Sequence, residues 1–144
     1  MSEKQGEGLY VWEDTEYYGS FEKDAMEGYA RIKFSDNEFY EGKIKNGRRC
    51  GSGVYRYANG DEFKGEWKND EKLYGVYKFH EGGSFEGRFK MNKISYGVMV
   101  YENGESYEGE FTDGERGGKG AYRNHLKEIM LEGKWQRDQF ISHY

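Results

Sequence analysis

The sequence predicts an all-β fold, an elongated single-layer antiparallel meander of consecutive β-hairpins in which each solenoid-like unit contacts only its neighbours. Three observations support this prediction. Segments of five residues with a central glycine and a large apolar residue at each end recur at steps of 23, 23, 22, 22 and 24 residues. A second signature of glycines and aromatic residues lies halfway between them, and Asn-Gly or Asp-Gly pairs typical of tight hairpin turns follow many of these segments.

Each five-residue segment, called a pentad below, alternates large apolar residues with glycine and charge. A period of two indicates a β-strand. We expect the central glycines to be structural, because a Cβ atom between two rings would collide with side chains of the neighbouring strands. These glycines are Gly19, Gly42, Gly65, Gly87, Gly109 and Gly133, in pentads that start near residues 17, 40, 63, 85, 107 and 131.

The second signature, G-x-G-x-aromatic-x-aromatic, is most complete at residues 51–57 and makes the second strand of each hairpin. A copy near the N-terminus predicts a half repeat at 6–12. Since turn residues lie on both sides of the strands, neighbours in sequence should be neighbours in space. We expect the repeat array to cover residues 1–135 and the tail, 136–144, to form a short helix or an extended cap.

Alternation also separates two faces. One face is a trough of aromatic rings with a glycine floor, and the other carries charged pairs such as Glu41 and Lys43. An apolar strip of this size needs cover. Either strong twist closes the trough on itself, or a protein partner occupies it. The residues expected to form a protein-binding groove are Tyr40, Tyr55, Tyr57, Phe63, Trp67, Tyr77, Phe79, Phe85, Phe89, Tyr101, Tyr107 and Phe111.

Composition argues against several functions. The 144 residues carry a net charge of −5, so no global field draws the chain to nucleic acid. The sequence has neither the apolar region of a signal peptide nor a run near the ~18 apolar residues of a membrane span, which predicts a cytoplasmic protein. Its three His and the lone Cys50 lack metal-ligand spacing, and no phosphate-binding loop motif occurs. We therefore expect no catalytic residues, no enzymatic activity, no metal ion and no cofactor.

The pattern Y-x-G-x-W/F, an N-G or D-G turn, G-x-G-x-Y and a further turn, at a period near 23, resembles the MORN (membrane occupation and recognition nexus) repeat. The resemblance covers Gly6 to about Trp135, with about six repeats. The chain looks like the stand-alone MORN arrays of cytoskeletal and ciliary assemblies, including radial spokes. This resemblance implies a scaffold or adaptor in a cytoskeletal assembly such as the axoneme of a cilium or flagellum.

The expected partners are proteins, either a helical segment laid in the groove or a second repeat array, in a homo- or hetero-oligomer within a large complex. The alternative is a phosphoinositide-binding membrane tether. Its cations would come from the two densest groups, which are Lys43, Lys45, Arg48 and Arg49, and Arg116, Lys119 and Arg123. Glutamates are interleaved with these cations, and each surface cation contributes only ~1 kcal/mol near an anionic leaflet, so membrane lipid is not the favoured partner.

Overall fold

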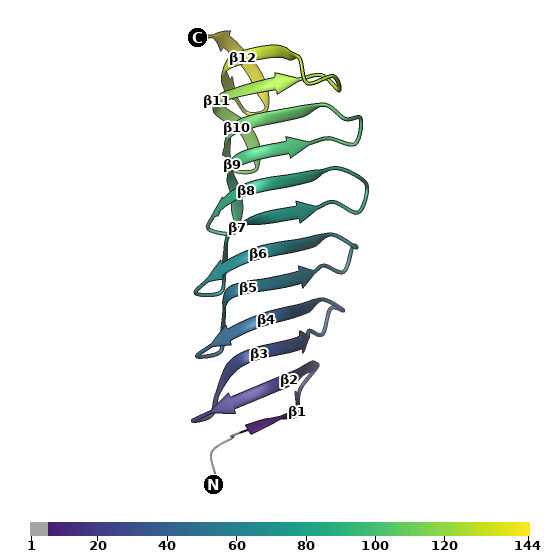
Figure 1. The fold of residues 1–144 in the computed structure, drawn as a ribbon, viewed down its shortest axis with the longest axis vertical. Helices are drawn as coiled ribbons and strands as arrows, with labels where there is room; N and C mark the ends of the chain where they lie inside the picture. The colour runs from purple at the N-terminus through teal and green to yellow at the C-terminus, as the bar shows by residue number, and fades with distance from the viewer. Residues whose placement is uncertain (1–5) are drawn as a thin grey trace. The chain divides into compact units, whose positions relative to one another are not determined.

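The computed structural model describes residues 6–144, which form β-strands and no helix (Figure 1). They divide into two compact units, one ending at Lys72 and the other beginning at Leu73, with the boundary inside β7 (Glu71–Lys78). Unit 1 contains β1 (Gly6–Trp12), β2 (Thr15–Glu22), β3 (Ala25–Lys33), β4 (Phe39–Lys45), β5 (Arg48–Arg56) and β6 (Glu62–Lys68). Unit 2 contains β8 (Ser84–Lys90), β9 (Lys93–Val100), β10 (Ser106–Thr112), β11 (Glu115–Arg123), β12 (Ile129–Gln136) and β13 (Gln139–His143).

Within each unit, every strand pairs antiparallel with the next strand in the sequence. The predicted all-β meander of consecutive hairpins is therefore confirmed. The predicted half repeat at 6–12 is β1. Of the two predictions for the tail, a short helix or an extended cap, the helix is not formed: β13 is extended, pairs with β12 and places Phe140 opposite Trp135. The meander thus continues beyond the boundary at 135 that the sequence suggested.

Two kinds of turn join the strands. At one end of the hairpins, two-residue turns hold both residues in the left-handed region, as at Asn46 (φ 52°) and Gly47 (φ 74°). Such turns match the twist of a hairpin. At the other end, most connections have five residues, as at Tyr57–Asp61, where the Tyr57 N–H donates to the Asp61 carbonyl at 2.9 Å. The two-residue turn between β1 and β2 lies at this second end, because β1 is a second-signature strand.

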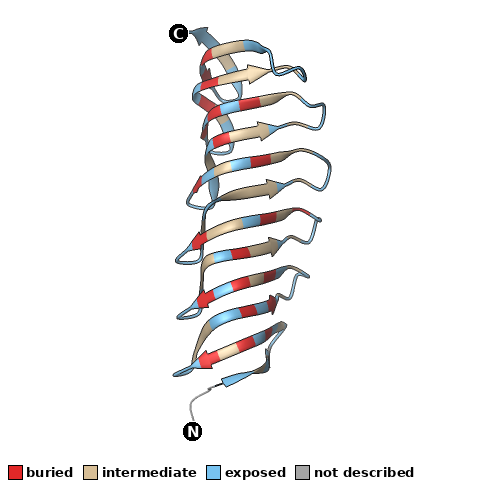
Figure 2. Ribbon diagram, viewed as in Figure 1, coloured by how far each residue is buried: buried red, intermediate tan, exposed pale blue. Residues whose placement is uncertain are grey.

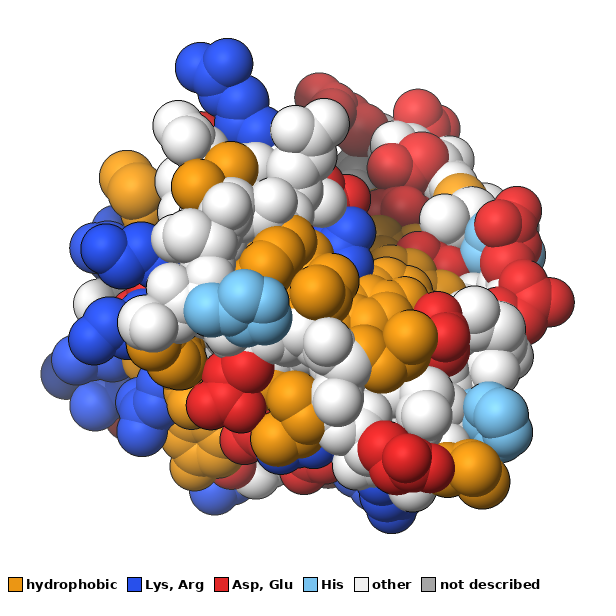
Figure 3. All heavy atoms as spheres, turned by 90° about the horizontal axis from the view of Figure 1, so that it is seen from above, with side chains coloured by type: hydrophobic (Ala, Val, Ile, Leu, Met, Phe, Trp, Pro, Cys, Tyr) orange, Lys and Arg blue, Asp and Glu red, His pale blue; other side chains and the backbone are white. Residues whose placement is uncertain are grey.

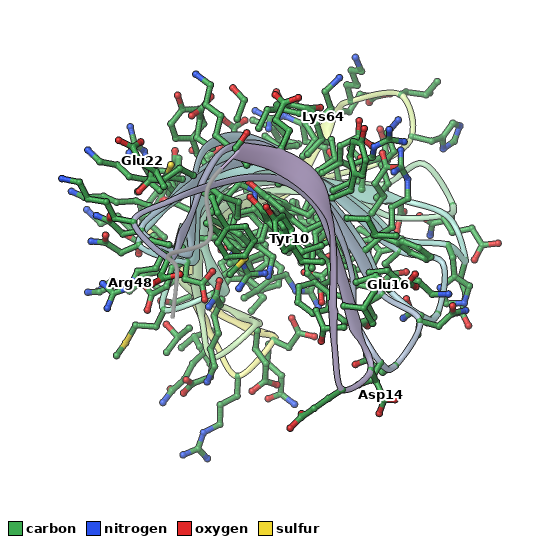
Figure 4. All side chains as sticks on the ribbon, turned by 90° about the horizontal axis from the view of Figure 1, so that it is seen from below. Tyr10, Asp14, Glu16, Glu22, Arg48 and Lys64 are labelled. Carbon is green, nitrogen blue, oxygen red and sulfur yellow. The ribbon has the colours of Figure 1, made fainter. Side chains whose placement is uncertain are left out.

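Each hairpin bends into an arch. The second strand carries extra residues where it passes the pentad glycine: Gly42 pairs with Gly53 and Ile44 with Arg49, so Cys50–Ser52 stand opposite Lys43 alone. Gly51, in the middle of this bulge, has a φ of 60°, which glycine adopts at little cost. A bulge bends its strand. Viewed along the array from the β1 end, Tyr10 lies inside the arch, and Glu22, Arg48 and Lys64 point outward (Figure 4).

A ladder of glycines crosses the sheet inside the arch. In unit 1 it runs through Gly42, Gly53 and Gly65, and in unit 2 it is uninterrupted from Gly75 to Gly133. The rings of Tyr17, Tyr40, Phe85 and Tyr107 lie over the glycines of their pentads, and a Cβ on Gly42 would stand 2.6 Å from the Tyr40 hydroxyl. Buried and exposed positions accordingly alternate along the strands (Figure 2). The core is therefore a row of ring-over-glycine contacts rather than a central cluster.

Candidate functional site

The arch makes the predicted groove a concave trough, and its residues fall into two sets. Seven are buried by neighbouring repeats: Tyr40, Phe63, Trp67, Phe85, Phe89, Tyr107 and Phe111. The other five remain half-buried: Tyr55, Tyr57, Tyr77, Phe79 and Tyr101. The repeats thus cover much of their own apolar face. Only the half-buried set and its neighbours are accessible to a partner without rearrangement.

The buried rings are fixed by polar contacts as well as by packing. The Tyr40 hydroxyl donates to the Lys43 carbonyl at 2.9 Å, and the Tyr107 hydroxyl makes the equivalent bond to Glu110 at 2.8 Å. Burial raises the pKa of Tyr107 to about 12. In both cases the hydroxyl proton is already donated to a backbone carbonyl of the same strand and is not available to a ligand. These two tyrosines therefore have a structural role.

A hollow of about 240 Å³ lies in the trough of unit 1. Its apolar walls are Met26, Ile32, Phe34 and Ile44, and the Arg49–Asp70 pair lies at its edge. It exists because Ile32 and Ile44 stand where the next repeat has the larger Tyr55 and Trp67. Met26 and Phe34 are only half-buried, so the hollow is open to an incoming side chain.

Arg49 lies in a box of aromatic rings. Its guanidinium carbon is 4.5 Å from the Trp67 ring centroid and 5.5 Å from that of Tyr55. The Arg49 Nε donates to Asp70 Oδ1 at 2.6 Å, and Nη2 donates to the Asp70 carbonyl at 3.0 Å. Burial acts to raise the pKa of Asp70, but the hydrogen bonds from Arg49 outweigh it and hold that pKa below its usual value.

Unit 2 repeats this arrangement. Arg116 Nε donates to Asp138 Oδ1 at 2.6 Å, and the guanidinium carbon lies 4.8 Å from the Trp135 ring centroid. In both units the tryptophan also donates to a glycine carbonyl, from Trp67 at 3.3 Å and from Trp135 at 3.0 Å. Two of the seven cations considered for phosphoinositide binding are therefore held within the trough by rings and a carboxylate.

The next cation along unit 1 is Lys72. Its Nζ lies 5.5 Å from the Tyr57 ring centroid and 5.8 Å from that of Trp67. Burial, followed by the charge of Arg49, lowers the pKa of Lys72 to about 8. Burial also raises the pKa of Tyr57 to about 12. The accessible part of this trough therefore combines ring faces, a tyrosine hydroxyl and cationic side chains.

The sequence contained a signal for the arginine boxes that charge counting missed. Two-residue alternation places Arg49 on the same face as Tyr55, so it could be assigned to the trough rather than to a surface cluster. In both boxes an arginine, a tryptophan and an aspartate recur at equivalent positions. In two other repeats Met26 and Ile94 take the position of the arginine, and the next two-residue turn ends in glycine instead of aspartate. Met26 and Phe34 were missed because their repeat departs from the aromatic pattern.

Across residues 6–144, no group of three or more His, Cys, Asp or Glu side chains is placed to hold a metal ion. In the same range, no helix is long and apolar enough to cross a membrane.

Comparisons with known proteins agree with the repeat pattern. A family model described as MORN repeat matches residues 17–38, 40–62, 63–73, 85–106 and 107–124, more than half of the chain. Alsin from Rattus norvegicus is 35% identical over 66 residues, which cover 42% of this chain and 4% of alsin. Alsin from Mus musculus and from Homo sapiens match with the same identity and coverage, so the chain spans a small fraction of the length of these relatives. With matches in five segments along its hairpins, the chain belongs to the MORN repeat family.

Proposed function

We propose that the chain is a non-catalytic scaffold or adaptor that holds a segment of a partner protein in its concave trough. MORN repeats point to a scaffold role in binding proteins or membranes. The observation that carries the narrower proposal is the open hollow of about 240 Å³ beside Phe34 and Arg49. Small-molecule sites usually enclose ~300–1,000 Å³, so this hollow suits single apolar side chains of a polypeptide better.

The half-buried rings extend this surface. Phe34 stacks on Tyr55 with ring centroids 5.9 Å apart, and Tyr55 lies 4.6 Å from Tyr57. Aromatic side chains with one face packed and one face open are common anchors in protein interfaces. We place the protein in the cytoplasm, in a cytoskeletal assembly such as a radial-spoke-like complex of a ciliary axoneme, and this setting rests on the family resemblance alone.

Matched aromatic substitutions test the trough. Phe34→Ala and Tyr57→Ala remove rings from the trough, whereas Phe39→Ala and Tyr18→Ala remove the same ring types from the exposed outer face. Affinity purification from the native source with quantitative mass spectrometry should lose its specific partners with the first pair and keep them with the second. Melting curves identify any variant that fails to fold. Equal loss with both pairs contradicts the proposal.

A second experiment, vesicle sedimentation, decides the membrane-tether alternative. Vesicles of phosphatidylcholine with added phosphoinositide serve as the probe, and Lys45→Glu with Arg48→Glu reverses two exposed cations. Sedimentation that is strong in the unmodified protein, weakened by salt and abolished by these reversals would favour the tether, because exposed charges are screened over ~8–10 Å at ordinary ionic strength. The scaffold proposal expects little sedimentation.

A further inference from the structure

We propose that the segment held in the trough is basic and amphipathic, with its Lys and Arg side chains along one lip and its apolar side chains against the trough. This inference rests on the proposed function and adds the chemistry and orientation of the partner. Each unit has one lip of this kind, called its acidic lip, which consists of the connections at 13–14, 34–38 and 57–61 in unit 1 and of those at 79–83, 101–105 and 124–128 in unit 2.

In unit 1 the acidic lip carries carboxylates and no Lys or Arg. Its acidic residues are Glu13, Asp14, Asp36, Glu38 and Asp61. Glu13, Asp14 and Asp36 are exposed, and within residues 6–144 none of the three forms an ion pair with Lys or Arg. Figure 4 shows Asp14 at the tip of one arm of the arch, on the opposite side from Arg48. One border of the trough in this unit is therefore uniformly negative.

Glu38 turns from this lip toward the trough. Its carboxylate accepts a hydrogen bond from the Tyr55 hydroxyl at 2.6 Å, and its other oxygen accepts from the Ala58 N–H at 3.1 Å. Glu38 and Tyr55 thus join the negative lip to the ring on which Phe34 stacks. Apolar contact and negative charge are available to the same bound segment within unit 1.

The corresponding connections of unit 2 are also mostly acidic. Its acidic lip carries Glu81, Glu102, Glu105 and Glu128, against a single Lys127. Glu105 accepts from the Tyr122 hydroxyl at 2.8 Å, as Glu38 does from Tyr55. Seen from the C-terminal end, acidic side chains gather on one side and Lys and Arg side chains on the other (Figure 3).

The opposite lip, at the two-residue turns, has no such excess. With one flanking residue counted on each side of every connection, the acidic lip of unit 1 carries six anions, which are the five named above and Glu62, and two cations, Lys33 and Arg56. Counted in the same way, the two-residue turns of unit 1 carry four cations and four anions, which are Lys23, Lys45, Arg48 and Lys68, and Glu22, Asp24, Asp70 and Glu71. One anion of this lip, Asp70, is already paired with Arg49. Within unit 1, a segment lying in the trough therefore meets a net negative charge on one lip only, which fixes its orientation as well as favouring its basic residues.

Designed peptides test the inference on the full chain. The basic probe is a fluorescent amphipathic helix of about 18 residues, roughly 27 Å long, with a leucine stripe flanked by lysine. The acidic probe replaces each lysine with glutamate. Fluorescence anisotropy should show the basic probe binding, with an affinity that falls as salt increases. The acidic probe should bind at least about tenfold more weakly, because like charges meet at the lip.

Two triple variants with the same net charge separate the lip from the overall charge of the protein. In unit 1, Glu13→Gln, Asp14→Asn and Asp36→Asn neutralise exposed positions of the acidic lip, and Glu22→Gln, Asp24→Asn and Glu71→Gln neutralise exposed positions at the opposite turns. The first variant should weaken the basic probe about 5- to 20-fold, from three exposed charge contacts. The second should change its affinity less than about twofold.

Equal binding of the two probes, equal weakening by the two triple variants, or no binding of either probe overturns the inference. If both probes bind equally and both are lost with Phe34→Ala, the trough still binds polypeptide and only the charge selection is wrong. The loss of native partners described above remains a separate measurement, so failure of the inference and failure of the scaffold proposal can be told apart.

Discussion

At the residue scale, the fold depends on rings that lie directly over glycine. A Cβ atom added to Gly53 would stand 2.6 Å from Cε1 and Cζ of the Tyr40 ring. Because Tyr40 is almost fully buried, its ring has no room to withdraw. We predict that Gly53→Ala lowers the free energy of unfolding by about 1–3 kcal/mol through overpacking. Lys64→Gln, on the exposed face, should cost less than about 0.5 kcal/mol. Thermal or denaturant unfolding compares the two, and equal stabilities would mean that the faces are assigned wrongly.

Asp70 supports a second prediction at this scale, concerning pH. Its pKa is lower in the folded state than in an unfolded chain, so its contribution to stability is present at neutral pH and is lost as pH falls through the folded pKa. We predict that Asp70→Asn costs about 1 kcal/mol at pH 7, discounted for a side chain that is half exposed. The difference from the unmodified protein should shrink below pH ~4. Denaturant titrations at pH 7 and pH 3 measure it, and an undiminished difference at pH 3 would contradict the assignment.

At the element scale, the two-residue turns hold their backbone in the left-handed region. Some of these turns contain residues that rarely adopt this conformation. Met91 has a φ of 53° and is 75% exposed, in a position where the equivalent turn has Asn46. Asparagine tolerates this region better than a long side chain does. We predict that Met91→Asn stabilises the protein by about 0.5–1 kcal/mol, whereas Met91→Val, which is β-branched, destabilises it. Melting temperatures that change in the same direction for both variants would count against the turn geometry.

The elements also show where prediction from sequence ends. Alternation in each pentad placed Tyr40, Gly42 and Ile44 on one face, because strand geometry leaves only two choices. How far each ring is covered was not predictable: Tyr55 and Tyr40 lie on the same face, yet one stays half open and the other is buried. Coverage depends on the bend introduced by the bulge at Gly51 and on the size of residues from the next repeat, which local pattern does not specify.

At the scale of the whole molecule, stability should be local. Substantial contacts within each unit are all between consecutive strands, as in other repeat proteins. We predict that Trp135→Ala, which removes a buried ring and its bond to the Gly120 carbonyl, weakens amide hydrogen-exchange protection in β10–β13. Protection in β2–β4 should stay within about twofold of the unmodified protein. Uniform loss of protection across the chain would indicate a single cooperative core instead.

The mode of construction sets how such a chain can change in length over evolution. A single added residue within a strand would exchange its two faces, and a two-residue turn has no spare backbone to absorb it. The five-residue connections are constant in length as well, and the 22- to 24-residue spacing of the pentads arises in the strands, where bulges of different size absorb the extra residues: β5 has nine residues and β9 has eight. Gain or loss of binding surface therefore comes in whole hairpins, each about 10 Å of sheet. Duplication of the gene segment that encodes a whole hairpin, rather than gradual insertion of single residues, is therefore the expected route to a longer binding surface.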